Sequence, residues 1–203
     1  MKVLTEYDIE LTNKIAKIMN DAGSDKHSDH NYSHGYAYFL SKLPSLSKIN
    51  FLEIGIANVE PDKSSLHGWS KLFSDSNIYG IDLFEHKMIE KDNIKTFVAN
   101  QASIVDLSRF KENAGYPKFD VILDDGSHYF GHAIVSFDYL FNSLKSHGIY
   151  MIEDVGKIHS MYGQSVYDWE EYLSDQDDLD WEVIDCRPDR IDDDSILIGI
   201  WRK

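Results

Sequence analysis

The chain has 203 residues, of which 42% are hydrophobic and 13% aromatic, a composition typical of a globular domain. It carries 20 basic and 35 acidic residues, a formal net charge of −15, without the clustered Lys and Arg that binding to a nucleic-acid backbone requires. No apolar run approaches the roughly 20 residues of a membrane span, the N-terminus lacks the apolar core of a secretory signal, and Cys186 is the only cysteine. We therefore expect a cytoplasmic protein that binds neither nucleic acid nor membrane.

The N-terminal part of the chain is predicted to be helical. Apolar residues recur at helical spacing over residues 5–20, and Gly23 ends that helix. Residues 23–32 are polar and turn-rich, which indicates a loop, and a second short helix is expected over residues 33–43. Residues 1–45 should therefore form a helical cap over the remaining chain, residues 46–203, within a single domain.

From residue 49 onward, predicted strands alternate with predicted helices. We expect strands at residues 49–56, 78–83, 95–99, 119–123 and 148–152, and helices at 64–73, 104–113, 131–145 and 167–173. Two further strands, 181–185 and 195–201, should form a hairpin at one edge of the sheet. This order predicts a Rossmann-like α/β fold with a mostly parallel, doubly wound sheet and an N-terminal helical layer.

Two apolar strands end in acidic residues. Residues 119–123 lead into Asp124, Asp125, Gly126, Ser127 and His128, and residues 148–152 lead into Glu153 and Asp154. In open α/β sheets the carboxyl ends of the strands border the ligand crevice. If these two strands are neighbours, Asp125 and Glu153 should face one another across a gap that suits a divalent cation.

The acidic residues and the histidine suggest metal-assisted chemistry. Asp125, Glu153 and Asp154 offer hard oxygen ligands that suit Mg²⁺, Mn²⁺ or Ca²⁺ better than zinc. Successive strand residues point to opposite faces, so Glu153 and Asp154 can both bind the ion only if the strand breaks there. His128 is placed to act as a general base on a metal-bound hydroxyl. The alternative is that the carboxylates cap helices and His128 is an ordinary turn residue.

A second group of residues suggests a nucleoside cofactor. Glu53 and Gly55 end the first strand, and Asp82 ends the second, where an acidic residue takes ribose hydroxyls in nucleotide-binding α/β units. Ala57 and Val59 follow Gly55 in place of the glycines that let a backbone approach a diphosphate. An adenosine cofactor without phosphates, S-adenosylmethionine, fits this pattern better. The alternative is that Gly55 only ends a strand and Asp82 only caps a turn.

Three histidines, His27, His30 and His34, lie in or beside the polar loop. Their spacing matches no closed zinc site, and no cysteine lies nearby. We interpret residues 23–32 as a polar lid that folds over the cleft, with Asp25, Lys26 and Tyr32 within reach of cofactor or substrate.

Taken together, these motifs resemble those of the metal-dependent sugar O-methyltransferases typified by the mycinamicin VI and macrocin enzymes. The similarity extends over about residues 22–157. Its matching stretches are residues 23–26 with His30 and Tyr32, 52–55, 65–73, 78–82, 100–103, 124–128 and 148–154. The block Asp-Asp-Gly-Ser-His, followed by Ile-Glu-Asp, is the more specific part.

The resemblance implies a class I methyltransferase fold that uses S-adenosylmethionine and a divalent metal, expected to be Mg²⁺. It implies metal binding by Asp125, Glu153 and Asp154, with His128 as base. Cofactor binding is expected from Glu53, Gly55, Asp82, Gln101, Ala102, Ser103 and Asp124. The long N-terminal domain of the macrolide enzymes has no counterpart here, so a smaller acceptor, such as a nucleotide-linked or polysaccharide sugar, is expected.

We therefore expect methyl transfer from S-adenosylmethionine to a hydroxyl of a sugar or of a sugar-containing small molecule. Two alternatives stay open: a nicotinamide-dependent oxidoreductase and a non-catalytic ligand-binding module on the same sheet. The sequence does not identify the acceptor, the hydroxyl that is methylated or the native metal. It also leaves the oligomeric state open, and a homo-oligomer is one of the possibilities.

Overall fold

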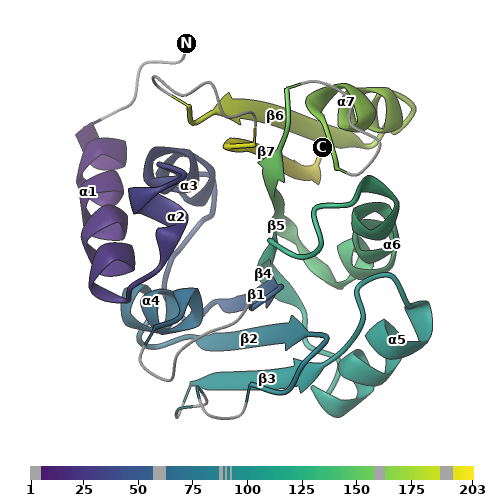
Figure 1. Ribbon diagram of the computed structural model, residues 1–203, viewed down its shortest axis with the longest axis horizontal. Coiled ribbons are helices and arrows are strands. Elements are labelled where there is room, and N and C mark those ends of the chain that lie inside the picture. Colours follow the sequence, from purple (N-terminus) through teal and green to yellow (C-terminus); the bar gives the residue numbers. More distant parts are fainter. Residues whose placement is uncertain are drawn as a thin grey trace.

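A computed structural model describes residues 6–56, 63–86, 89, 91, 93–157, 163–187 and 194–203, with the backbone alone for residues 6 and 7. A seven-stranded sheet crosses the molecule with helices on both faces (Figure 1). The helices are α1 (Glu6–Asp21), α2 (Asp25–Ser28), α3 (Ser33–Leu40), α4 (Ser65–Leu72), α5 (Ile104–Asn113), α6 (Phe130–Leu140) and α7 (Val166–Ser174). The strands are β1 (Asn50–Ile54), β2 (Asn77–Asp82), β3 (Ile94–Val98), β4 (Phe119–Asp124), β5 (Leu144–Val155), β6 (Leu179–Asp185) and β7 (Ile196–Arg202).

The sheet has the strand order β3-β2-β1-β4-β5-β7-β6. Strands β1 to β5 run parallel, and β7 runs antiparallel to both β5 and β6. The predicted doubly wound, mostly parallel sheet is thus confirmed, as is the hairpin at one edge. Because β1 and β4 are neighbours that lead in opposite directions along the sheet, a crevice is expected at their carboxyl ends.

Each face of the sheet has its own hydrophobic core. Helices α1, α3 and α4 cover one face, where Ile15, Tyr36 and Trp69 pack near Phe51 and Val121 of the sheet. Helices α5, α6 and α7 cover the other face. The strands are buried on both sides, which is why they read as nearly continuous apolar runs rather than as alternating ones. The N-terminal helical layer is therefore part of the main core.

The structure corrects the predicted junction between α6 and β5. The helix expected over residues 131–145 ends at Leu140, and a 3₁₀ turn (Phe141–Ser143) leads directly into β5. Leu144 pairs with Phe119 of β4, so β5 begins four residues earlier than expected. Phe141 and Leu144 are apolar and buried although they lie outside α6. Their spacing therefore continues the apolar pattern of the helix and could not show where it ends. The predicted loop at residues 23–32 likewise contains the single-turn helix α2.

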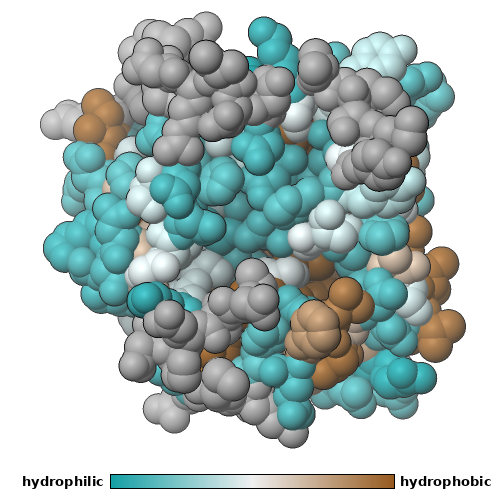
Figure 2. All heavy atoms as spheres, viewed as in Figure 1, coloured by the Kyte–Doolittle hydropathy of each residue, from teal (hydrophilic) through white to brown (hydrophobic). Residues whose placement is uncertain are grey.

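Hydrophilic side chains dominate the face of the molecule seen in Figure 1, and hydrophobic ones gather toward its lower right (Figure 2). None of the helices in the described part of the chain combines the length and apolar character that crossing a membrane requires.

Candidate active site

A cavity of about 610 Å³ opens at the carboxyl ends of the parallel strands. Residues at or just after the carboxyl ends of β1 to β5 line it, together with the segment that joins α1 to α3. Of the predicted site residues, the cavity is lined by Gly55, Asp82, Gln101, Asp125, His128, Glu153 and Asp154. The fold therefore brings most of the predicted metal and cofactor residues to one place.

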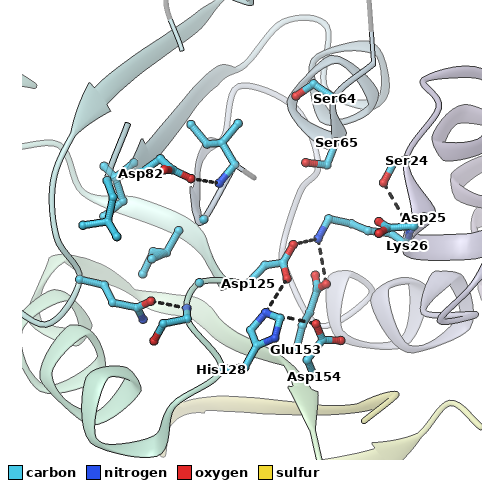
Figure 3. A pocket seen from close by; sticks show the side chains of 18 of the residues that line it. Ser24, Asp25, Lys26, Ser64, Ser65, Asp82, Asp125, His128, Glu153 and Asp154 are labelled. Carbon is cyan, nitrogen blue, oxygen red and sulfur yellow. Dashed lines mark hydrogen bonds and ion pairs between the residues drawn. The ribbon is translucent and has the colours of Figure 1, made fainter. Parts of the chain in front are cut away.

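Asp125, His128 and Asp154 form a compact cluster. One potential ligand atom from each lies within 4.8 Å of the others. The Nε2 atom of His128 lies 3.4 Å from Asp125 Oδ1 and 3.2 Å from Asp154 Oδ2, so the imidazole bridges the two carboxylates (Figure 3). Oxygen donors at this spacing suit a hard divalent cation.

A break in β5 lets two successive carboxylates reach the site. Asp154 has a left-handed backbone conformation, with φ of 51°, and the pairing of β5 with β7 shifts register between Ile152 and Val155. Such a bulge interrupts the alternation of side chains along a strand. Glu153 and Asp154 consequently both line the cavity, as the metal hypothesis requires.

Lys26 lies among three carboxylates that come from three strands. Its Nζ atom is 2.5 Å from Asp125 Oδ2 and 2.8 Å from Glu153 Oε2 (Figure 3). It also lies 3.2 Å from Glu53 Oε1. Glu153 also accepts a hydrogen bond from the Tyr36 hydroxyl. Asp125 and Glu153 thus share the ammonium group of Lys26, whereas the sequence predicts that they share a divalent ion. Metal binding by Glu153 stays a prediction.

The electrostatics of the cluster follow from burial and from these contacts. Burial lowers the pKa of Lys26, but Asp125, Glu153 and Glu53 together raise it well above its ordinary value. Burial raises the pKa of Glu53 to about 7, with Lys26 acting in the opposite direction. Burial would also raise the pKa of Asp125, but Lys26 and His128 hold it below its ordinary value. Lys26 therefore stays charged.

His128 is half-buried and its backbone is also left-handed, with φ of 55°. Burial lowers its pKa, but the hydrogen bond to Asp125 and the charge of Asp154 outweigh that effect and raise the pKa to about 9. The same carboxylate oxygens can pair with the imidazolium or with a divalent cation. Each of these two cations weakens the binding of the other.

Two glycines allow the loops of the site to approach closely. Gly55 has φ of +84°, and a Cβ atom there would lie 2.1 Å from the carbonyl oxygen of Asp125. A Cβ atom on Gly126 would lie 1.9 Å from Gln101 Oε1. Gly55 therefore has a structural role beyond ending β1, because it lets the loop after β1 pack against the turn that carries Asp125.

Asp82 organises the loops at the end of the cavity near β1 and β2. Its Oδ2 atom accepts a hydrogen bond from the Ile56 N–H at 2.8 Å, and its Oδ1 atom accepts one from the Phe84 N–H at 3.0 Å. These bonds fit the alternative reading of Asp82 as a capping residue. A contact with ribose is compatible with its place in the cavity lining and stays a prediction.

Other predicted cofactor residues have structural partners in this arrangement. Asp124 is buried and accepts hydrogen bonds from Ser136, Tyr150 and Gln101. Gln101 in turn accepts the Ser127 N–H at 2.6 Å. These bonds position the turn beneath Asp125, and the predicted cofactor contact of Asp124 stays a prediction.

Glu53, Ala102 and Ser103 also have local roles. Glu53 is fully buried, and the Ser65 hydroxyl donates to its carboxylate at 2.8 and 2.9 Å. Ser103 caps α5 by accepting the Asp106 N–H, and the Ala102 N–H donates to Asn100. Cofactor binding by these three residues stays a prediction as well.

The predicted lid, residues 23–32, lies against the carboxylate cluster. Tyr32 donates to Asp154 Oδ1 at 2.6 Å, and His30 Nδ1 lies 3.5 Å from the same atom. His27 instead bonds Ser33. Among the described residues, the three histidines His27, His30 and His34 do not form a metal-binding group. The contacts of Lys26 and Tyr36 with the carboxylates were missed from the sequence, although Lys26 lies within the motif at residues 23–26.

Comparisons with known proteins confirm the resemblance. No protein-family model matches the chain. A curated relative from Streptomyces olivaceus, the 8-demethyl-8-alpha-L-rhamnosyl tetracenomycin-C 2'-O-methyltransferase, is 28% identical over 149 residues, which cover 72% of this chain and 39% of the relative. The 3'-O-methyltransferase that acts on the 2-methoxy-rhamnosyl compound in the same organism is 36% identical over 110 residues, 53% of this chain and 28% of the relative. The chain thus spans well under half the length of these relatives.

Among solved structures, the MycE methyltransferase of the mycinamycin pathway, in complex with Mg, SAH and mycinamycin VI, has a TM-score of 0.76. The match covers 93% of this chain and 54% of MycE, at 21% sequence identity. This structural similarity establishes a shared fold. The fold is the predicted class I Rossmann-like methyltransferase fold. The chain is therefore a homologue of O-methyltransferases that are named for sugar-bearing natural products.

Proposed function

We propose that the protein transfers a methyl group from S-adenosylmethionine to a hydroxyl of a sugar or of a sugar-containing small molecule, with Mg²⁺ at the carboxylate cluster. The observation that carries the proposal is the convergence of Asp125, His128 and Asp154 within 4.8 Å at the mouth of the β1–β4 crevice. The relatives, which are named as sugar O-methyltransferases, support the choice of acceptor.

The residues of the cluster fit a divalent cation. Asp125 and Asp154 offer oxygen atoms at a spacing that one ion can bridge, and Asp125 and Glu153 already hold one cation between them. A divalent ion bound there lowers the pKa of a coordinated hydroxyl and fixes its position. In the proposed site Asp125, Glu153 and Asp154 would hold the ion.

The residues along the other side of the cavity suit the cofactor. Gly55, Asp82 and Gln101 line the cavity on the side of β1 and β2, where nucleosides bind in sheets of this kind. S-adenosylmethionine supplies an electrophilic methyl group, so the chain mainly has to position the two reactants. Glu53, Ala102, Ser103 and Asp124 complete the proposed cofactor side, at least in part through the bonds that hold its loops in place.

In this proposal His128 removes the proton of the acceptor hydroxyl as a neutral imidazole, the form that a divalent cation on Asp125 and Asp154 would favour over the imidazolium. Its Nε2 atom lies between Asp125 and Asp154, so a hydroxyl beside those carboxylates is within its reach. The two carboxylates orient the imidazole toward the cavity and away from the core. Base catalysis by a placed histidine contributes about 10²- to 10⁴-fold to a rate.

We also propose that residues 1–203 act as a single methyltransferase domain, with residues 1–45 as its helical cap. The shared core of the N-terminal helices and the sheet supports this organisation. The charge of −15 and the buried free thiol of Cys186 support a cytoplasmic enzyme that acts on small molecules rather than on nucleic acid.

Mass spectrometry of candidate sugars incubated with the protein, S-adenosylmethionine and Mg²⁺ tests the proposal. A gain of one methyl group that disappears in excess chelator supports it. Cofactor binding without methylation of any sugar in a panel of nucleotide-linked, polysaccharide and natural-product glycosides indicates a non-catalytic module. Calorimetric binding of NAD(H) in place of S-adenosylmethionine indicates an oxidoreductase.

A further inference from the structure

A lysine ammonium lies where the carboxylates of three strands converge, and the proposed reaction assigns it no role. Lys26 belongs to the single-turn helix α2, and only 2% of the residue is exposed. Its Nζ atom is within 3.2 Å of Glu53, Asp125 and Glu153. A buried ammonium with three carboxylate partners is far from a typical surface lysine, which belongs to no more than one weak ion pair.

The backbone around Lys26 holds its side chain in this position. The Ser24 hydroxyl caps α2 by accepting the Lys26 N–H at 3.3 Å. The Lys26 carbonyl accepts the Tyr32 N–H at 2.9 Å, which closes the turn that follows. The side chain is therefore directed inward from a fixed turn.

The carboxylates around Lys26 are crowded, and each also has a second partner. Tyr36 donates to Glu153, Ser65 donates to Glu53, and His128 lies against Asp125. These neighbours are two hydroxyl groups and a half-buried imidazole, whereas Lys26 places a buried ammonium group against all three carboxylates. Without a cation at this point, three carboxylates would be crowded together with no opposite charge among them, which disfavours their charged forms.

We propose that Lys26 is a built-in counter-ion of the carboxylate cluster, which keeps Asp125 and Glu153 at ion-sharing distance and with which a divalent cation competes. This inference rests on the proposed cation site but not on any acceptor or on methyl transfer. Lys26 acts as a positioning residue. It stabilises the metal-free protein and weakens metal binding, because Asp125 and Glu153 must exchange one cation for another.

The test compares wild type with Lys26→Met, which keeps the length of the side chain and removes its charge. Lys17→Met is the matched control, because Lys17 forms an ion pair of 2.7 Å with Asp21 at the surface, where both side chains are exposed to water. Thermal unfolding is measured in EDTA and in Mg²⁺, and Mn²⁺ binding is measured by electron paramagnetic resonance. Neither cofactor nor acceptor is present.

We expect Lys26→Met to lower the melting temperature in EDTA by on the order of 10 °C, because the crowded carboxylates lose the ammonium that they share. Mg²⁺ should restore most of that loss, and Mn²⁺ should bind roughly tenfold more tightly than to wild type. Lys17→Met should change neither property. Failure of methyl transfer would leave these readouts unaffected, so it would bear only on the proposed function.

An unchanged melting temperature in EDTA, or Mn²⁺ affinity equal to or below that of wild type, would overturn the proposal. If Lys26→Met does not fold even in Mg²⁺, the double variant Lys26→Met with Glu53→Gln decides, since it removes one carboxylate along with the ammonium. Recovery of folding in the double variant supports the counter-ion role, and failure to recover shows that the side chain is needed for packing alone.

Discussion

Tyr32 and Asp154 are joined by two hydrogen bonds that involve the same hydroxyl group. The Tyr32 Oη atom donates to Asp154 Oδ1 at 2.6 Å and accepts the Asp154 N–H at 2.9 Å. Asp154 is the left-handed residue of the β5 bulge, with φ of 51°. The N-terminal layer thus holds in place the strand irregularity on which the carboxylate cluster depends.

Tyr32→Phe removes both of these bonds without opening a cavity. We expect the free energy of unfolding to fall by about 2 kcal/mol, because a carboxylate that is only 11% exposed and a backbone N–H each lose a partner. Mg²⁺ affinity should fall about 10-fold, the lower end of the usual effect when a group that orients a metal ligand is lost. Chemical denaturation and metal titration measure the two effects.

Tyr38→Phe is the control for that change. Tyr38 lies on the same helix as Tyr36 and also donates to a carboxylate, that of Glu182 in β6, away from the cavity. Its loss should leave Mg²⁺ affinity unchanged. Equal metal affinities in Tyr32→Phe and wild type would show that the bulge keeps its shape without Tyr32.

His128→Ala should separate binding from catalysis. We expect S-adenosylmethionine binding to persist and the turnover number to fall by about 10²- to 10⁴-fold, because the proposed proton acceptor is lost. Calorimetry and a methyl-transfer assay give the two values. His147→Ala, whose imidazole bonds Asp120 outside the site, should retain normal turnover. Turnover of His128→Ala near the wild-type value would show that His128 is not the base.

Removing the metal, or one of its proposed ligands, should abolish methyl transfer. With excess EDTA we expect loss of activity and recovery on adding Mg²⁺, because the coordinated hydroxyl then regains its lowered pKa. Asp125→Asn should lose at least about tenfold in metal affinity, since a carboxylate ligand becomes a neutral amide. Full activity in chelator would contradict the metal-dependent mechanism.

Gly55→Ala should disturb the site through its backbone. The new Cβ atom would lie 2.1 Å from the Asp125 carbonyl oxygen, so the turn carrying Asp125 must move. We expect weaker binding of both Mg²⁺ and S-adenosylmethionine and a loss of more than about 2 kcal/mol in the free energy of unfolding. Circular dichroism melts and binding titrations measure these changes.

Gly115→Ala isolates the backbone part of that effect. Gly115 has φ of +80°, close to that of Gly55, but a Cβ atom there meets nothing within 4 Å. Replacing Gly115 should lower the free energy of unfolding by only about 1–2 kcal/mol, because alanine disfavours the left-handed conformation, and it should leave ligand binding intact. If both variants behave alike, the contact between Gly55 and Asp125 has no role in the site.

Much of the fold was predictable because the strands are buried on both faces and alternate with amphipathic helices. The junction between α6 and β5 was not, since Phe141 and Leu144 are buried in either state. The convergence of Asp125 and Asp154 followed from the rule that parallel strands end at one edge of a sheet. The break at Asp154 was recognised as a requirement, but nothing local in the residues 152–155 predicts a bulge.

The partners of the carboxylates could not be predicted from spacing. Lys26 is 27 residues before Glu53 and 99 before Asp125 along the chain, so only the packing of α1 to α3 on the sheet brings it to the cluster. Asp124 and Asp125 are adjacent in sequence, yet one lies buried beneath the turn and the other lines the cavity. Strand alternation allows that difference but does not say which residue faces inward.

The helices before β1 supply more than a cover. A shortened chain that began at β1 would retain all eleven residues assigned to cofactor, metal and base, and by its motifs alone would look complete. It would nevertheless lack both the ammonium that separates Glu53, Asp125 and Glu153 and the phenol that restrains Asp154. The carboxylate cluster therefore depends on the helical segment before β1, although the sequence motifs of the sheet give no sign of that dependence.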